Sequence, residues 1–170
     1  FWVILSSLYE PVQRLRRKQS LSRGVLGMTV AHIGVAMFCI GVTVVQTYRI
    51  EKDIALKPGQ SVELQGYTFA FDSLESVAGP NYDAVQSHFT VTRDGKLVAK
   101  LNPQKRVYRV RTMPMTEAGI AVNWNRDLFI AMGDDLGANA WSVRVQYKPM
   151  VRFIWFGALV MAIGGFIAIT

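Results

Sequence analysis

Two long runs of apolar residues without a charged side chain constrain this sequence of 170 residues more than any other feature. The first run covers residues 24–46 and the second covers residues 153–170. A helix rises about 1.5 Å per residue, so about twenty apolar residues cross the hydrocarbon layer of a bilayer. We therefore predict transmembrane helices over residues 24–47 and 153–170.

A shorter apolar stretch, residues 1–8, precedes the first run. It is too short to span a bilayer, and its order of apolar and then basic residues is the reverse of a signal peptide. We expect it to be the end of a further transmembrane helix that begins outside this sequence. The chain is then a piece of a longer membrane protein.

Basic residues concentrate between these two apolar stretches, in residues 9–23. They are Arg14, Arg16, Arg17, Lys18 and Arg23. Basic residues beside membrane helices stay on the cytoplasmic side, and no aromatic residues interleave with this cluster as they do in nucleic-acid binders. We predict a cytoplasmic loop and no nucleic-acid partner. Lys148 and Arg152, which flank the outer end of the last helix, oppose this orientation.

The first full span then delivers residues 48–149 to the other side of the membrane, which in a bacterium is the periplasm. This section alternates apolar and polar residues, as half-buried strands do. Its clearest alternation is Tyr67, Phe69 and Phe71, and Gly66 before it is typical of a bulge or bend. Asp94-Gly95 lies between two alternating runs and predicts a tight hairpin.

Further strands are predicted over residues 85–92, 97–101, 105–111, 120–124 and 140–147, and residues 126–133 fit either a strand or a short helix. Several short strands without a helical period favour a small barrel or sandwich. The predicted fold class is a membrane α-helical protein with an all-β domain. Two transmembrane helices, and the tail of a third, flank a small periplasmic β-barrel or β-sandwich.

His32, inside the first span, is the most informative single residue. An ionisable group at membrane depth is costly and points to a function. One interpretation makes it a neutral ligand of a metal, of which haem iron is a common intramembrane case. The other makes it a hydrogen-bond donor to a neighbouring helix. Gly27, Ala31 and Gly34 form a small-residue face where another helix or a flat ligand can approach closely.

Other polar residues carry weaker signals. His88 lies on the polar face of an alternating run and is interpreted as a solvated side chain. Asp134 and Asp135 lie between glycines in a pattern typical of a solvated turn. The single cysteine, Cys39, excludes a disulfide framework within this chain and is interpreted as inert packing. Catalytic residues cannot be assigned from these motifs.

Several stretches resemble the CcmF family of haem lyase subunits from bacterial cytochrome c maturation. They are residues 27–36, 62–82, 91–96, 115–118, 126–128, 141–149 and 151–155. The resemblance covers nearly the whole chain in order and is to the C-terminal portion of the family. The resemblance distinguishes CcmF less well from the paralogous haem lyase subunit of nitrite reductase assembly.

The resemblance implies an activity and its partners. Family members take haem from a haem chaperone and join it by thioether bonds to the CxxCH motif of apocytochrome c, together with a thiol-handling subunit. They sit in the bacterial inner membrane among lipid and hold a haem b through a transmembrane histidine pair. His32 matches one ligand of that pair and is the expected axial ligand of the haem iron. The rest of the haem-handling surface is expected outside this chain.

A second hypothesis makes the chain a non-catalytic, membrane-anchored β-module that docks assembly partners. Its cationic residues would then form a surface for haem propionates or acidic partners. These residues are Arg106, Arg109, Arg111, Arg126 and Arg144.

Overall fold

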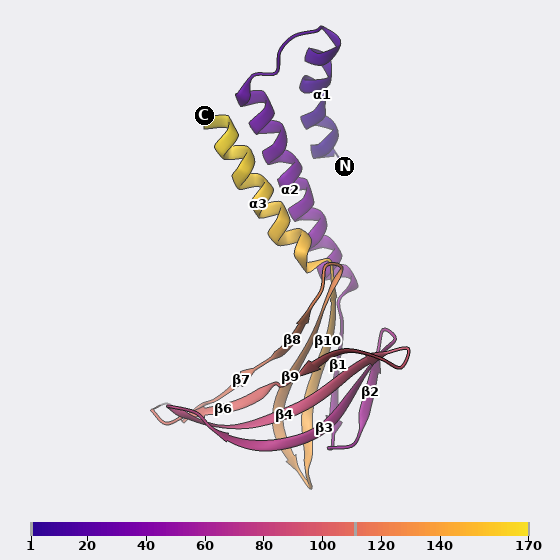
Figure 1. Cartoon of the computed structure of the whole chain (residues 1–170), viewed down its shortest axis with the longest axis vertical. Helices are drawn as coiled ribbons and strands as arrows, with labels where there is room; N and C mark the ends of the chain where they lie inside the picture. Colours follow the sequence, from indigo (N-terminus) through magenta and orange to yellow (C-terminus); the bar gives the residue numbers. More distant parts are fainter. Residues whose placement is uncertain (1, 111, 170) are drawn as a thin grey trace. The chain divides into compact units, whose positions relative to one another are not determined.

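The computed structural model describes residues 2–110 and 112–169, which divide into two compact units (Figure 1). One unit comprises three helices, and the other is an all-β domain between the second and third helices. Two of the helices are long and apolar enough to cross a membrane, Arg23–Tyr48 and Val151–Ile169. The predicted class, two apolar helices around a small β-domain, is confirmed.

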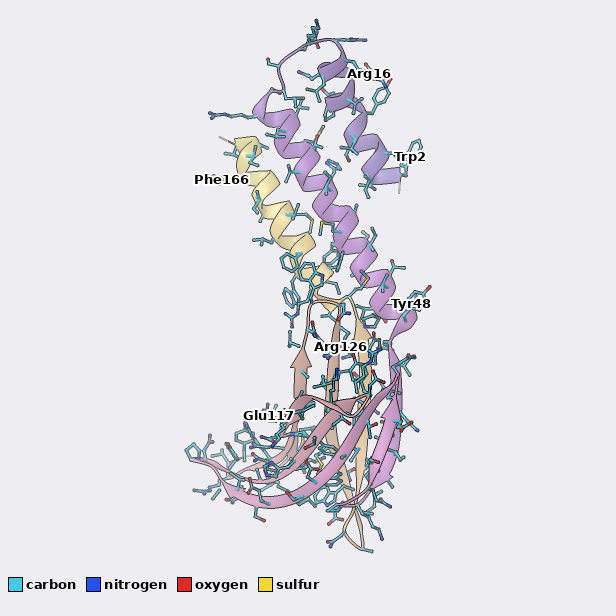
Figure 2. All side chains as sticks on the ribbon, turned by 45° about the vertical axis from the view of Figure 1, so that its right-hand side comes forward. Trp2, Arg16, Tyr48, Glu117, Arg126 and Phe166 are labelled. Atoms are coloured by element: carbon cyan, nitrogen blue, oxygen red, sulfur yellow. The ribbon has the colours of Figure 1, made fainter. Side chains whose placement is uncertain are left out.

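The helical unit contains α1 (Trp2–Arg16), α2 (Arg23–Tyr48) and α3 (Val151–Ile169). Large apolar side chains remain exposed on its outside, such as Trp2 and Phe166, which project from α1 and α3 in Figure 2. An apolar helix with an exposed apolar surface is typical of a segment surrounded by lipid or by further helices.

Helix α1 extends beyond the predicted end at Leu8, and only residues 17–22 connect it to α2. Glu10 and Arg14 support the added turns through an ion pair of 2.7 Å, one helical turn apart. The helix ends where Lys18 takes a left-handed conformation with a φ of 54°. The backbone N–H groups of Lys18 and Gln19 then bond back to the carbonyls of Leu15 and Arg14, which is a Schellman cap.

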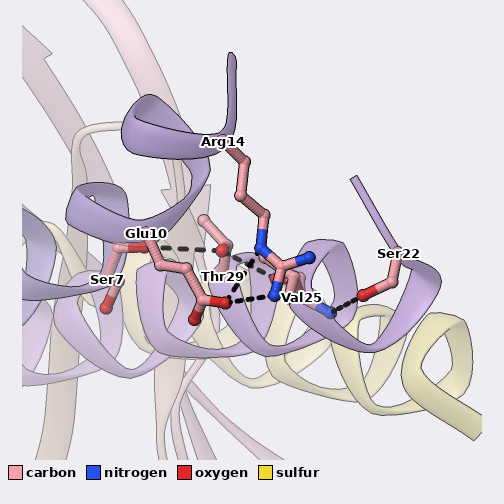
Figure 3. Close-up of polar contacts among 6 residues, drawn as sticks. All are labelled: Ser7, Glu10, Arg14, Ser22, Val25 and Thr29. Atoms are coloured by element: carbon pink, nitrogen blue, oxygen red, sulfur yellow. Dashed lines mark hydrogen bonds and ion pairs between the residues drawn. The ribbon is translucent and has the colours of Figure 1, made fainter. Parts of the chain in front are cut away.

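Pro11 lies inside α1 without interrupting it. A proline has no N–H, so the carbonyl of Ser7, one turn earlier, loses its helical partner. The hydroxyl of Thr29 on α2 lies 3.4 Å from this carbonyl and shares its proton with the Val25 carbonyl at 2.8 Å (Figure 3). The position that proline leaves open is therefore used to join α1 to α2.

Glycines at intervals of seven residues hold α2 and α3 together as an antiparallel pair. A Cβ atom on Gly34 would lie 2.5 Å from the backbone nitrogen of Met161, and one on Gly157 would lie 2.5 Å from that of Phe38. A Cβ on Gly27 would lie 2.5 Å from the backbone nitrogen of Ala168 near the end of α3, and one on Gly41 would lie 2.9 Å from that of Ile154 near its start. The two backbones therefore touch along the whole pair, as small residues allow in membrane helices.

The β-domain consists of two sheets. The four-stranded sheet has the order β1-β10-β9-β8, and the six-stranded sheet has the order β2-β3-β4-β6-β7, with β5 paired to β4. The strands of the first sheet are β1 (Ile50–Leu56), β8 (Gly119–Val122), β9 (Arg126–Gly137) and β10 (Ala140–Pro149). Those of the second are β2 (Ser61–Leu64), β3 (Tyr67–Ala78), β4 (Tyr82–Arg93), β5 (Lys96–Leu101), β6 (Gln104–Tyr108) and β7 (Pro114–Glu117).

The alternating residues of the strands meet between the sheets and form the core. Phe71 on β3 stacks on Phe89 on β4 with ring centroids 4.6 Å apart, and both are fully buried. The opposite sheet contributes fully buried residues of its own, and these are Leu128, Ile130, Met132, Val143 and Val145. Alternation in the sequence therefore predicted the inward faces correctly.

The turns confirm part of the predicted pattern and correct the rest. Asp94-Gly95 is a tight hairpin, with both residues at positive φ. Of the bulge or bend expected at Gly66, the structure shows the bend, because Gln65 and Gly66 form a second hairpin turn of the same kind between β2 and β3. Residues 126–133 are a strand, part of β9, and Asp134 and Asp135 continue that strand rather than form a turn. Strands β1 and β7 were not predicted.

Replacing Gly34 by alanine should destabilise the helical unit by about 1–3 kcal/mol, because its methyl group would overlap the backbone of α3. Gly165→Ala on α3 is the matched control, since a Cβ there meets no atom within 4 Å. The midpoint of thermal unfolding of the purified full-length protein in detergent measures the difference. Equal midpoints for the two variants would contradict the close packing.

Candidate functional site

The surface of helix α2 has three parts: one contacts α3, one contacts α1 and one is exposed. Its glycine face contacts α3, and the face that carries Thr29 and Ala36 is buried on the side where Thr29 bonds to α1. His32 lies on neither face. At 100° per residue, it is rotated by roughly 140° from Gly27. Its side chain is exposed, and it forms a stripe with Met28, Val35 and Cys39, which are also exposed.

A single hydrogen bond orients the His32 ring. Its Nδ1 lies 2.8 Å from the backbone carbonyl oxygen of Met28, one turn earlier. A carbonyl oxygen only accepts, so Nδ1 carries the proton and donates it. The neutral ring then has its lone pair on Nε2. A backbone carbonyl behind a histidine is the usual arrangement that orients a metal-binding imidazole.

Of the two occupants expected for the small-residue face, a helix or a flat ligand, the structure shows the helix. Gly27 and Gly34 are in contact with the backbone of α3, so a helix fills this face and a porphyrin cannot. The expectation that this face admits the porphyrin beside His32 is therefore wrong. A flat ligand of His32 has to approach from the stripe that includes Met28 and Cys39.

His88 belongs to a polar network on the surface of the β-domain. Its Nε2 lies 3.1 Å from a carboxylate oxygen of Glu75, and its Nδ1 lies 3.0 Å from the side-chain oxygen of Asn102. Both ring nitrogens are thus engaged by neighbouring side chains. Within residues 2–110 and 112–169, no group of three or more His, Cys, Asp or Glu side chains is placed to hold a metal ion.

The two adjacent acids do not form a catalytic pair. Asp134 is bound to the ammonium group of Lys105 at 3.0 Å, and Asp135 accepts the backbone N–H of Gly137 at 2.8 Å. They follow one another in a strand, so their side chains point to opposite faces. Both are exposed, as the sequence predicted.

The arginines of the β-domain do not form the expected cationic surface. Arg106 pairs with Glu117 at 3.3 Å, and Arg109 pairs with Asp83 at 3.5 Å. Arg144 donates two hydrogen bonds to Asp53, and these lower the pKa of that carboxyl group. Arg111 lies outside the described residues.

Arg126 is buried rather than on the surface, with only 5% of its area exposed, and it lies among the strands in Figure 2. Its Nε donates to the hydroxyl of Tyr67 at 3.0 Å, and Arg93 donates to the same oxygen at 3.0 Å. Burial works to raise the pKa of Tyr67, but the two guanidinium groups outweigh it and lower that pKa. A phenol that accepts from two cations thus ties β3, β4 and β9 together.

The family model for the CcmF C-terminal beta-sandwich matches residues 47–149 of this chain. The chain belongs to the CcmF family. The resemblance seen in the sequence is thereby confirmed, and the boundaries of the matched region agree with those of the β-domain.

Curated CcmF proteins align with almost the whole chain. The cytochrome c-type biogenesis protein CcmF of Pseudomonas aeruginosa is 43% identical over 98% of this chain, and that of Escherichia coli is 38% identical over 99%. The related protein NrfE of Haemophilus influenzae is 35% identical over 99% of the chain. The chain spans about a quarter of the length of these relatives, 26% in each case.

A solved structure shares the fold of this CcmF family member. It is a cytochrome c haem lyase CcmF, which superimposes with a TM-score of 0.73 at 21% sequence identity. The likeness covers 86% of this chain and 24% of that one. It therefore includes more than the matched β-sandwich, which accounts for residues 47–149 alone.

Tyr67→Phe should lower the stability of the β-domain by about 1–3 kcal/mol, because it leaves the buried Arg126 Nε without its acceptor. Tyr82→Phe is the matched control, since there the ring contacts the Arg106 guanidinium, 4.5 Å from the ring centroid. Thermal unfolding of the purified protein, followed by circular dichroism in the β-sheet region, compares the two. A smaller effect at Tyr67 than at Tyr82 would contradict this role.

Proposed function

We propose that this chain is the C-terminal part of a membrane haem lyase of cytochrome c maturation, and that His32 is an axial ligand of a haem b inside the membrane. The observation that carries the proposal is the hydrogen bond from His32 Nδ1 to the Met28 carbonyl. It makes Nδ1 the donor, so that Nε2 can bind a metal, and it places the ring on an exposed stripe of α2 between the surfaces that contact α1 and α3.

The residues present fit one axial position of a haem. The hydrogen bond directs Nδ1 to the Met28 carbonyl, so the neutral ring, the form in which histidine binds iron, has its lone pair on Nε2. The apolar neighbours of His32 on the stripe, Met28 and Val35, suit the body of a porphyrin. When bound, haem supplies an iron that can change its oxidation state. The chain's own contribution is to orient the ring and to present the lone pair.

The second axial ligand comes from outside this chain. The sequence contains two histidines, and both ring nitrogens of His88 are engaged by Glu75 and Asn102. A bis-histidine site therefore draws its other ligand from another segment of the full-length protein. The catalytic surface also lies mostly outside these 170 residues.

The substrates and partners follow from the family. Relatives are named as proteins of cytochrome c-type biogenesis, and one solved relative is named as a cytochrome c haem lyase. On this basis the full-length protein transfers haem from a haem chaperone to the CxxCH motif of apocytochrome c, alongside a thiol-handling subunit. It does so in the bacterial inner membrane, with the β-domain in the periplasm. The two apolar helices support this location.

Replacing His32 by alanine tests the ligand role. We expect the haem b content of the purified full-length protein to fall by roughly tenfold or more. Removing a group that only orients a metal ligand already lowers metal affinity by about tenfold or more, and removing the ligand itself should lower it further. The pyridine haemochrome spectrum, divided by protein concentration, measures it without reference to activity.

His88→Ala is the matched control, as it removes the other histidine and leaves α2 unchanged. It should retain full haem b content. Full content in His32→Ala would refute the ligand role, and an equal loss in both variants would assign the loss to general instability.

A further inference from the structure

The hairpin between β8 and β9 ends in an exposed apolar tip. Its turn is residues 123–125, and the backbone N–H of Asn123 donates to the Arg126 carbonyl at 3.0 Å across it. Trp124 in this turn has 60% of its area exposed, and Val122, the last residue of β8, has 57%. We call residues 122–125 the Trp124 tip. Neither apolar side chain contributes to the buried core, so their exposure indicates an interaction surface.

The Trp124 tip lies at one particular end of the β-domain. Arg126, the first residue of β9, donates to the Tyr67 hydroxyl, and the Tyr67 ring lies 6.2 Å from the Tyr147 ring, centroid to centroid. Tyr147 in turn pairs with Ile50, the first residue of β1. The tip is therefore at the end of the domain where β1 begins and β10 ends.

Short pieces of chain join this end of the β-domain to the membrane helices. Strand β1 begins at Ile50, four residues after the first apolar run ends at residue 46, and β10 ends at Pro149, four residues before the second run begins at residue 153. Four residues reach at most about 14 Å even when fully extended. Because both connections are this short, the chain itself keeps this end of the β-domain near the surface of the bilayer.

The side chains at this end have the chemistry of a membrane interface. Tyr48 at the end of α2 and Trp155 in the first turn of α3 are exposed, as aromatic residues at the headgroup level are. Trp124 adds an amphipathic ring of the same kind from the β-domain. Arg49 and Lys148 lie at the two connections, where basic groups attract anionic headgroups. A lipid surface therefore suits the tip both in chemistry and in reach.

We propose that the Trp124 tip inserts into the interfacial layer of the membrane and anchors the β-domain there. The Trp124 ring and the Val122 side chain lie among the outermost acyl carbons, and the asparagines on either side of the ring face the headgroups. The β-domain then contacts the bilayer at a third point besides its two chain connections, which limits its rotation about them. This proposal rests on the two membrane helices and does not depend on the role of His32.

Fluorescence quenching measures lipid contact at the tip. Asn125→Cys, labelled with nitrobenzoxadiazole in an otherwise cysteine-free full-length protein, is placed in nanodiscs of phosphatidylethanolamine and phosphatidylglycerol. A phospholipid with a nitroxide on carbon 5 of its acyl chain should quench this label severalfold more than the same label at Leu136→Cys, which is exposed near the opposite end of β9. Iodide, which stays in water, should show the reverse order.

Two results of this measurement would overturn the proposal. Equal nitroxide quenching at the two positions would show that the tip does not enter the bilayer. A label at position 125 that neither the nitroxide nor iodide reaches would show that another protein segment covers the tip.

Trp124→Ala tests the tryptophan itself. In the protein labelled at position 125, it should lower nitroxide quenching and raise iodide quenching severalfold, because the indole ring anchors the turn at the interface. Leu136→Ala is the matched control, as it removes a similarly exposed apolar side chain from the far end of β9 and should change neither. Unchanged quenching in Trp124→Ala would overturn the anchoring role. Its thermal midpoint in detergent should equal that of the parent protein, and a lower midpoint would assign the change to folding instead.

Discussion

The contact between the backbones of α2 and α3 determines how α2 is rotated in the helical unit. Gly34 and Gly157 leave no room for a side chain between the helices, so any other rotation of α2 would bring a larger residue into the contact and separate them. The remaining surfaces of α2 are assigned by this one constraint. Thr29 then meets the carbonyl that Pro11 leaves open on α1, and His32 stays outside both contacts.

The same constraint leaves the imidazole of His32 accessible, as the proposed ligand role requires. A histidine inside the glycine contact would be enclosed by α3, and one on the α1 face would compete with Thr29 for the Ser7 carbonyl. On the exposed stripe, Nδ1 of His32 donates a hydrogen bond to the Met28 carbonyl of its own helix. The orientation of the ring thus depends on a contact within α2 itself.

The β-domain combines a closed core with an open end. Phe71, Phe89 and the opposing Ile130 fill the space between the sheets. The Tyr67 hydroxyl accepts an N–H of the buried Arg126 and so offsets part of the cost of burying this charge. Beyond the end of β8, no strand among the described residues pairs with β9 on that side, and there the two sheets enclose an open cavity. The closed core and the open end therefore lie along the same strand.

Periodicity in the sequence determined the class of this fold, the two apolar helices and most strands, because these depend on residues near one another in the chain. It could not reveal that Arg126 is buried or that Arg106, Arg109 and Arg144 are paired, since their partners lie far away in sequence. Strand β7 was missed because its four residues contain a proline and no alternation. Only the tertiary structure decided two further features: the packing of α3 on the glycine face, and the edge of β9 beyond β8 that pairs with no described strand. Both depend on which segments the folded chain brings together, and a local pattern does not contain that information.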